Sequence, residues 1–233
     1  MNVNKRHPIT AIAQELTPPL LWNILKRTTN SISRPNISHD TVPGTQQQAS
    51  HYNEIYAESE EYRKHYTASQ YYFLWCVVVD RLKRANCQAI LDIGCGSGQF
   101  ASMLWNAGIP QYVGLDFSET AIFLARNHCP GYRFVCESAF DTNLFLKYNY
   151  DLVISMEFLE HVDDDIAILN RIPSGKKFLG TVPSFPYKSH VRFFSGPERV
   201  AERYEPLFSQ FRVDTILADN RGARYFLFDG VKN

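Results

Sequence analysis

From residue 89 onward, short apolar runs alternate with segments whose apolar residues recur three and four positions apart. The apolar runs predict strands and the second kind of segment predicts helices. Strands are expected at 89–93, 112–115, 132–136, 151–155, 177–182, 211–217 and 224–229. Helices are expected at 99–107, 118–127, 157–170 and 197–208. Strands that alternate with helices indicate a parallel sheet covered by helices on both faces.

The last two predicted strands are separated only by residues 218–222. A parallel connection needs a crossover of about a dozen residues or more, so this short link predicts a hairpin. One strand of the sheet is therefore expected to run antiparallel to the others.

Two segments precede this alternation. Residues 51–84 have helical spacing and many tyrosines, which predicts a helical cap, with 89–233 as the core of a domain over 51–233. Residues 1–50 are predicted to form an extension, with a short helix at 18–27 and a polar linker after it. That helix packs on the domain or on a second subunit, or it lies on a membrane surface with Trp22 at headgroup depth.

Composition narrows the class of protein. The chain has 233 residues, 45% of them hydrophobic, and 24 basic residues balance 24 acidic ones. A neutral chain has no overall field to attract nucleic acid, although a local basic groove remains open. The five cysteines include no C-x-x-C pair, which favours a reducing cytoplasm without structural zinc. No apolar run approaches the length of about 18 residues that a membrane-spanning helix needs.

A glycine-rich turn follows the first predicted strand. Gly94, Gly96 and Gly98 allow the backbone to approach a ligand closely, and the next helix begins beside them. The G-x-G-x-x-G pattern of dinucleotide enzymes would require glycine at position 99, where this chain has Gln99. Asp116 ends the second strand, where a carboxylate can accept both hydroxyls of a ribose. The turn therefore favours an adenosine cofactor without a pyrophosphate.

Four motifs stand in order along 91–162: L-D-I-G-C-G-S-G, G-L-D-F-S, V-C-E-S-A-F and Y-D-L-V-I-S-M-E-F-L-E-H-V. This series resembles the motifs of class I S-adenosylmethionine (SAM)-dependent methyltransferases. The resemblance implies a Rossmann-like α/β sheet of seven strands with the last one antiparallel. It also implies that Asp92 and the glycines hold the methionine end of SAM, Asp116 the ribose, and 137–139 the adenine. The implied cofactor-binding residues are Asp92, Gly94, Cys95, Gly96, Gly98, Asp116, Phe117, Glu137, Ser138 and Met156.

Three polar residues follow the fourth strand. On the predicted helix, Glu157, Glu160 and His161 would share one face beside the cofactor. Acidic residues at a helix start are also ordinary structural features, and related methyltransferases carry Leu-Glu-His-Val without a metal. The E-x-x-E-H pattern nevertheless resembles the cation-binding segment of ubiquinone-pathway O-methyltransferases and plant small-RNA 2′-O-methyltransferases. Two carboxylates and an imidazole suit Mg²⁺ or Mn²⁺, which would lower the pKa of an acceptor hydroxyl.

The loop after the fifth strand, 183–195, is rich in proline and aromatic residues and leaves the carboxyl edge of the sheet. His190 is a candidate general base or further ligand beside the candidate catalytic His161, or a loop histidine with an ordinary hydrogen bond. The candidate acceptor-binding residues are Tyr66, Glu157, Tyr187 and Arg192. For Arg192 the expected partner is an acceptor carboxylate or phosphate.

Methylation of a small-molecule or sugar hydroxyl is the leading hypothesis. The Pro-Pro-Leu-Leu segment resembles methyltransferases associated with surface polysaccharides, which favours a sugar. A nucleic-acid acceptor of the small-RNA type is a second hypothesis, which the lack of a basic tract disfavours. A catalytically silent partner subunit with the same fold is a third. Nothing in the sequence sets the oligomeric state.

Overall fold

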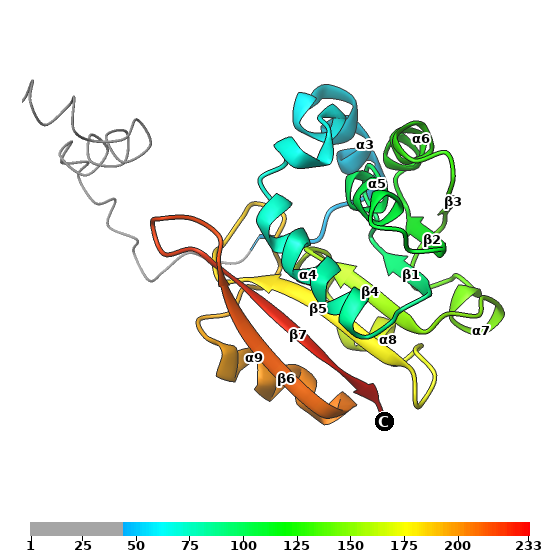
Figure 1. Cartoon of the computed structure of the whole chain (residues 1–233). Helices are drawn as coiled ribbons and strands as arrows, with labels where there is room; N and C mark the ends of the chain where they lie inside the picture. Colours follow the sequence, from blue (N-terminus) through cyan, green and yellow to red (C-terminus); the bar gives the residue numbers. More distant parts are fainter. Residues whose placement is uncertain (1–43) are drawn as a thin grey trace, which may run out of the picture. The chain divides into compact units, whose positions relative to one another are not determined.

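The computed structural model describes residues 44–233, which belong to one compact unit, Val42–Asn233. Its centre is a seven-stranded sheet with the strand order β3-β2-β1-β4-β5-β7-β6 (Figure 1). The strands are β1 (Ala89–Ile93), β2 (Gln111–Asp116), β3 (Arg133–Cys136), β4 (Leu152–Met156), β5 (Lys177–Pro183), β6 (Phe208–Leu217) and β7 (Arg224–Lys232). The predicted helix at 18–27 lies outside the described residues, and the division into 1–50 and 51–233 stays a prediction.

The five strands β1 to β5 are parallel, and β7 runs antiparallel between β5 and β6. This arrangement confirms the predicted Rossmann-like sheet, its seven strands and the terminal hairpin. The order reverses at β1, whose Asp92 pairs with Gly114 of β2 and Ile154 of β4. Ligands of open α/β sheets bind outside the carboxyl ends of the strands at such a reversal.

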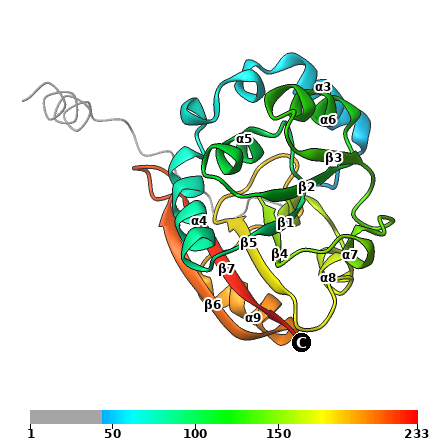
Figure 2. The same cartoon turned by 45° about the vertical axis from the view of Figure 1, so that its right-hand side comes forward.

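Helices cover both faces of the sheet (Figure 2). The α-helices are α3 (Ala49–Glu58), α4 (Tyr72–Arg84), α5 (Gln99–Asn106), α6 (Glu119–His128), α7 (Leu144–Lys147), α8 (Asp165–Leu169) and α9 (Pro197–Tyr204). Short 3₁₀ turns are η1 (Glu60–Arg63), η2 (Tyr66–Ala68), η3 (Leu159–His161) and η4 (Glu205–Leu207). Side chains of α4, α5 and α6 fill one apolar core, and those of α7, α8 and α9 fill the other. Because strand side chains alternate, Ile90 enters the first core and Leu91 the second.

The prediction of a helix over 157–170 is wrong. The chain forms the single turn η3 and then the separate helix α8, with extended Val162 between them. Asp164 is the reason for the restart, because its carboxylate accepts a hydrogen bond from the Ala167 amide at 3.1 Å and caps α8. Glu157, expected on a helix, has a φ of +52° instead.

The tyrosine-rich segment is also divided more finely than its periodicity predicts. Side chains of Ser59 and His65 accept backbone N–H groups and begin η1 and η2, so two turns separate α3 from α4. The helix α7 was not predicted at all. None of the helices within 44–233 is long and apolar enough to cross a membrane.

Candidate active site

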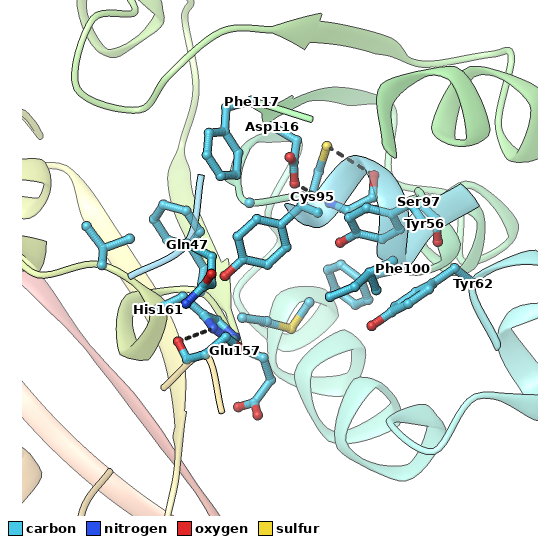
Figure 3. Close-up of a pocket in the computed structure, with 18 of the residues that line it drawn as sticks. Gln47, Tyr56, Tyr62, Cys95, Ser97, Phe100, Asp116, Phe117, Glu157 and His161 are labelled. Atoms are coloured by element: carbon cyan, nitrogen blue, oxygen red, sulfur yellow. Dashed lines mark hydrogen bonds between the residues drawn. The ribbon is translucent and has the colours of Figure 1, made fainter. Parts of the chain in front are cut away.

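A cavity of about 990 Å³ lies at the carboxyl edge of the sheet, where β1, β2 and β4 end (Figure 3). The glycine turn forms its floor, while α3 and η1 cover one side. The loop after β5 forms another side through residues 185–190. These walls come from segments far apart in sequence, and each brings a different kind of side chain.

The glycine turn after β1 keeps its backbone open toward the cavity. Gly94 and Gly96 have φ angles of +76° and +53°, and both line the cavity. A Cβ on Gly94 would lie 2.5 Å from the Phe158 ring, and one on Gly96 would lie 2.8 Å from the Tyr56 hydroxyl. A side chain at either position would therefore collide with Phe158 or Tyr56 at the cavity wall.

Gly98 has a different role from the other two glycines. A Cβ there would lie 2.7 Å from the Ala125 backbone, so this glycine lets α5 pack closely on α6. Gly98 does not line the cavity. The structure therefore places it beneath the turn, as a packing position, rather than at the predicted cofactor contact.

Asp116 stands at the end of β2 with its side chain in the cavity wall. Its carboxylate accepts hydrogen bonds from the amides of Gly96 at 3.0 Å and Ser118 at 2.9 Å. Burial outweighs these bonds and raises the pKa of Asp116 to about 6. The two amides orient the carboxylate and tie it to the glycine turn, as a ribose-binding group requires.

The remaining predicted cofactor residues also line the cavity: Asp92, Cys95, Phe117, Glu137, Ser138 and Met156. Asp92 is almost fully buried, and its carboxylate accepts a hydrogen bond from the Tyr112 hydroxyl at 2.6 Å. Burial raises the pKa of Asp92 to about 7. The sequence motifs thus name residues that the fold brings into one wall.

The helical cap is fastened to the core by side-chain hydrogen bonds. Asn53 of α3 accepts a bond from the Ser118 hydroxyl at 2.7 Å, next to Asp116. Gln99, the first residue of α5, donates from its amide to the carbonyls of Glu61 at 3.0 Å and Lys64 at 2.7 Å. The residue that departs from the dinucleotide pattern therefore anchors the cap.

Tyr66 does not fit its predicted position in the acceptor site. Its hydroxyl accepts a hydrogen bond from the Asn106 amide at 3.0 Å, and its ring packs on the core outside the cavity. Tyr52, Tyr56 and Tyr62 line the cavity in its place. Tyr187, by contrast, is at the cavity wall as predicted.

Glu157 reaches the cavity from the turn after β4. Its amide donates to the Thr181 hydroxyl, and that hydroxyl donates to the Glu157 carboxylate, both at 3.1 Å. Burial raises the pKa of Glu157 to about 8. A non-glycine residue at positive φ is uncommon, and here it turns the carboxylate toward the ligand space.

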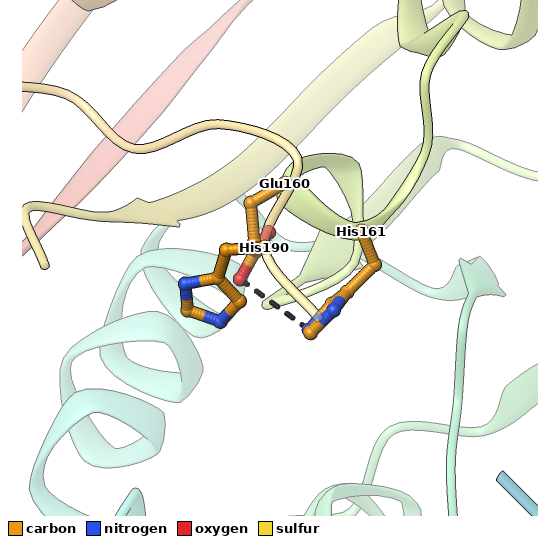
Figure 4. A group of neighbouring side chains, drawn as sticks. All are labelled: Glu160, His161 and His190. Atoms are coloured by element: carbon orange, nitrogen blue, oxygen red, sulfur yellow. Dashed lines mark ion pairs between the residues drawn. The ribbon is translucent and has the colours of Figure 1, made fainter. Parts of the chain in front are cut away.

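Glu160, His161 and His190 form a cluster of possible metal ligands (Figure 4). One possible ligand atom from each lies within 4.8 Å of the others. Glu160 is fully buried, and neither of its carboxylate oxygens has a hydrogen-bond partner among the described residues. The Glu160 Oε1 atom is 4.0 Å from Nε2 of His161.

Both imidazoles are oriented by backbone carbonyls. Nδ1 of His161 is 3.0 Å from the Ser189 carbonyl oxygen, and Nδ1 of His190 is 3.1 Å from that of Phe185. Since a carbonyl only accepts, each Nδ1 carries the proton and each Nε2 keeps its lone pair. Burial lowers the pKa of His161 to about 4 and lowers that of His190, so both rings are neutral.

An unpartnered carboxylate and two neutral imidazoles fit a divalent cation. The cluster differs from the predicted set of Glu157, Glu160 and His161. His190 belongs to it and Glu157 does not, since the Glu157 carboxylate is bonded to Thr181. His190 comes from the loop after β5. No local sequence motif indicates that it lies beside Glu160 and His161.

Arg192 is not at the cavity, contrary to its predicted contact with an acceptor anion. Its guanidinium donates to the carbonyls of Leu159, of Val162 at 2.5 Å and of Asp163 at 2.7 Å. It also lies 3.3 Å from the buried Asp165 carboxylate. Both terminal nitrogens of Arg192 thus donate to carbonyls of the turn that carries Glu160 and His161 or of the two residues after it.

Over part of its length the chain is similar to known methyltransferases. Residues 91–173 match a family described as a methyltransferase domain. Residues 91–173 therefore form a methyltransferase domain, and the fold is that of class I SAM-dependent methyltransferases. Among curated relatives is the ubiquinone biosynthesis O-methyltransferase of Hydrogenovibrio crunogenus, 32% identical over 124 residues that cover 48% of this chain and 50% of the relative. That of Neisseria meningitidis serogroup C is 29% identical over 119 residues, covering 47% and 50%.

The chain therefore spans about half the length of the curated relatives it matches. Among solved structures, the N-methyltransferase NodS from Bradyrhizobium japonicum, in complex with S-adenosylhomocysteine (SAH), superposes with a TM-score of 0.61. It shares 13% sequence identity, over 80% of this chain and 99% of that one. This likeness supports the fold of the methyltransferase domain.

Several residues at the site of the methyltransferase domain were missed by sequence reasoning. They share an aromatic ring at the cavity wall and come from segments outside the motifs: Tyr52, Tyr71 and Tyr225. Tyr52 links the two halves, since its ring centroid lies 5.4 Å from that of Phe117 and 6.0 Å from that of His161. The clustering of tyrosines in 52–72 was the one available signal.

Proposed function

We propose that the protein is a SAM-dependent methyltransferase that transfers a methyl group to a hydroxyl of a small molecule or a sugar. The observation that carries this proposal is the single cavity in which the glycine turn and Asp116 face the cluster of Glu160, His161 and His190. Curated relatives named as O-methyltransferases support a hydroxyl acceptor. Bound SAM would supply the electrophilic methyl group.

The chain's own residues would bind and orient that cofactor. Gly94 and Gly96 leave room for it against the backbone, and the Asp116 carboxylate is fixed by two amides toward the ribose position. Phe117 and Glu137 to Ala139 line the expected adenine end. The cap residues Tyr52 and Tyr56 would exclude water from the methyl group, which in-line displacement requires.

At the other end, Glu160, His161 and His190 would hold Mg²⁺ or Mn²⁺. Such a cation would lower the pKa of an acceptor hydroxyl. Without a cation, the neutral Nε2 of His161 or His190 is placed to accept the hydroxyl proton. Both versions keep these two histidines as the catalytic candidates.

A silent partner subunit is disfavoured by the intact glycine turn and Asp116. The cytoplasm is the compartment we propose, supported by five free cysteines, three of them buried. Peripheral membrane contact through residues 18–27 stays a prediction, because these residues lie outside the part of the chain that the structure describes.

Calorimetry with SAH tests the cofactor half. We expect binding, and we expect Asp116→Ala to weaken it by roughly 10- to 100-fold, because a charged hydrogen-bonding group contributes about 1.5–3 kcal/mol. Asp141→Ala is the matched control, since Asp141 is exposed and outside the cavity. Absence of heat with SAH in the unaltered protein would contradict the proposal.

Cation use is tested with the same protein. Titration with Mn²⁺ is expected to show a site that Glu160→Gln removes, because the amide keeps the side chain's shape but loses its charge. Equal Mn²⁺ binding in both proteins would contradict Glu160 as a ligand, and no Mn²⁺ binding by the unaltered protein would exclude the cation version and leave the histidines as the proton acceptors.

A further inference from the structure

Residues 44–48, which we call the strap, run along the cavity immediately before α3. Gly44 lies against the loop after β5, because a Cβ on Gly44 would collide with the carbonyl oxygen of Lys188. Two residues further on, the Gln46 side chain accepts a hydrogen bond from the Asp163 amide at 2.7 Å. All three glutamines of the strap line the cavity. The strap therefore contacts both segments that carry the cluster, the turn around η3 and the loop after β5.

The same stretch of chain is also anchored at the cofactor half of the cavity. The strap passes directly into α3, whose Asn53 accepts a hydrogen bond from the Ser118 hydroxyl at 2.7 Å. The Ser118 amide donates in turn to the Asp116 carboxylate at 2.9 Å. Tyr56 of the same helix lines the cavity on the side of the glycine turn, whereas Gln47 lines it on the side of His161 (Figure 3). One short segment thus has a contact at each half of the site.

This segment is held at its surface rather than by a core of its own. None of the residues of α3 is buried, and a helix of ten residues is marginal in water by itself. The residues of the strap are half-buried or exposed and form no regular secondary structure. Segments of this kind open at a low free-energy cost, so their order depends on the contacts that they make. A ligand that contacts either half of the site can therefore shift the order of the strap and α3.

At the cluster, the strap supports a residue that follows the ligand-bearing turn. The backbone of Asp163 has two partners, since its amide donates to Gln46 and its carbonyl accepts from Arg192 at 2.7 Å. Of these two supports, only Gln46 belongs to the segment that is also anchored beside Asp116. When the strap leaves, the Asp163 amide loses its partner and the residues that carry Glu160 and His161 lose one of their restraints.

We propose that Gln46 is a positioning residue that couples the two halves of the site. Cofactor binding orders α3 and the strap, and the Gln46 side chain then holds the Asp163 amide and fixes the turn that carries Glu160 and His161. This inference rests on the proposed function and deepens it, because the cofactor binds first and prepares the residues that act on the acceptor. Since coupling between two sites is reciprocal, a cation at the cluster also tightens cofactor binding.

Amide hydrogen exchange of the full chain, with and without SAH, tests the coupling in the absence of any metal. We expect SAH to slow exchange over 44–58 and, by roughly fivefold, over 159–163, which is the effect of about one hydrogen bond. Gln46→Met has a similar length but no strong acceptor, so it should abolish the slowing over 159–163 while 94–98 stays protected. Gln111→Met is the matched control, because Gln111 is exposed and outside the cavity.

The conservative variant Gln46→Glu separates the hydrogen bond from the shape of the side chain. Its carboxylate still accepts from the Asp163 amide, and a salt concentration of about 0.15 M screens the added charge. We expect this variant to restore the slowing over 159–163. If Gln46→Glu behaves like Gln46→Met, the hydrogen bond is not the link and the inference is overturned.

Reciprocity supplies a second readout. Calorimetric titration of SAH with and without Mn²⁺ is expected to show roughly threefold to fivefold tighter SAH binding when Mn²⁺ is present, and no such gain in Gln46→Met. An equal gain in the unaltered protein and in Gln46→Met would contradict the role of Gln46.

The outcomes separate this inference from the function on which it rests. If SAH does not bind, the proposed function fails and the inference fails with it. If SAH binds and protects 94–98 but leaves exchange over 159–163 unchanged, the inference is overturned while the cofactor site stands. If Mn²⁺ does not bind, only the cation version of the function fails, and the exchange measured with SAH alone still decides whether Gln46 couples the two halves.

Discussion

Asp92 is a carboxyl group held in the core beside the cofactor turn. It is 2% exposed, and the Tyr112 hydroxyl is its hydrogen-bond donor at 2.6 Å. Burial raises its pKa from the ordinary value of 3.8 to about 7. The unfolded chain therefore ionises this group at lower pH than the folded protein, which loses stability as the pH rises from about 4 to about 7.

Asp92→Asn removes that penalty. We expect its free energy of unfolding at pH 8 to exceed that of the unaltered protein by on the order of 2 kcal/mol, because no buried charge forms and Tyr112 keeps an acceptor. The gap should disappear near pH 4. Urea unfolding at both pH values measures it, with exposed Asp141→Asn as the control. At each pH, the comparison is the free energy of unfolding of Asp92→Asn minus that of the unaltered protein. A difference that is no larger at pH 8 than at pH 4 contradicts the prediction.

Residues within one motif could be placed from the sequence, and residues that depend on tertiary contacts could not. The turn around Gly94 and Gly96 and the position of Asp116 follow from local spacing, and the structure puts all three at the cavity. Tyr225 lies more than a hundred residues from them in β7, and only the antiparallel pairing brings it there. Arg192 looks like an anion-binding group because nothing in its local sequence shows the carbonyls it meets.

Among the elements, the conformation of η3 depends on hydrogen bonds from residues outside it. It is a single turn, too short to be stable alone. The Arg192 guanidinium donates hydrogen bonds to the carbonyl of Leu159 in η3 and to those of Val162 and Asp163 just after it. The amide of Val191 donates to the Glu160 carbonyl at 2.8 Å. The loop after β5 thereby fixes the turn that carries Glu160 and His161. The prediction of a longer helix here failed because these contacts replace helical hydrogen bonds.

Arg192→Lys keeps the charge but cannot reach several carbonyls at once. We expect faster amide hydrogen exchange over 159–163 and roughly tenfold weaker Mn²⁺ binding, as for other residues that orient metal ligands. Arg203→Lys is the matched control, because Arg203 also pairs with Asp165 but donates to none of those carbonyls. Unchanged exchange in Arg192→Lys would show that the turn holds its shape without the guanidinium.

For the molecule as a whole, the cavity exists only while the helical cap and the sheet stay together. The alternation of apolar runs predicts the seven strands and the short link predicts the hairpin, whereas the order of the strands in the sheet comes from the structure. The sequence predicted that the cap is helical. It did not predict which side chains bind the cap to the core of the domain. Gln99 and Asn53 make the joining hydrogen bonds, and their partners lie 35 or more residues away.

Gln99→Ala removes two of these hydrogen bonds. We expect SAH to dissociate faster and to bind roughly tenfold more weakly, since two neutral bonds of about 1 kcal/mol each no longer hold the cap closed. Stopped-flow displacement of SAH measures the dissociation rate. Gln88→Ala is the control, because the Gln88 side chain bonds only to Asn86 far from the cavity. A dissociation rate equal to that of the unaltered protein would mean that Gln99 does not govern the cap.

Trp75 of α4 lies at the base of the cavity, 5.8 Å from both Tyr71 and Phe100 between ring centroids. Trp105 is 52% exposed on another surface, and Trp22 completes the three tryptophans of the chain. The indole of Trp75 thus lies at the wall of the cavity, between Tyr71 and Phe100. We therefore expect the tryptophan fluorescence of the protein to change when a ligand occupies the cavity, so that binding can be followed without an attached dye.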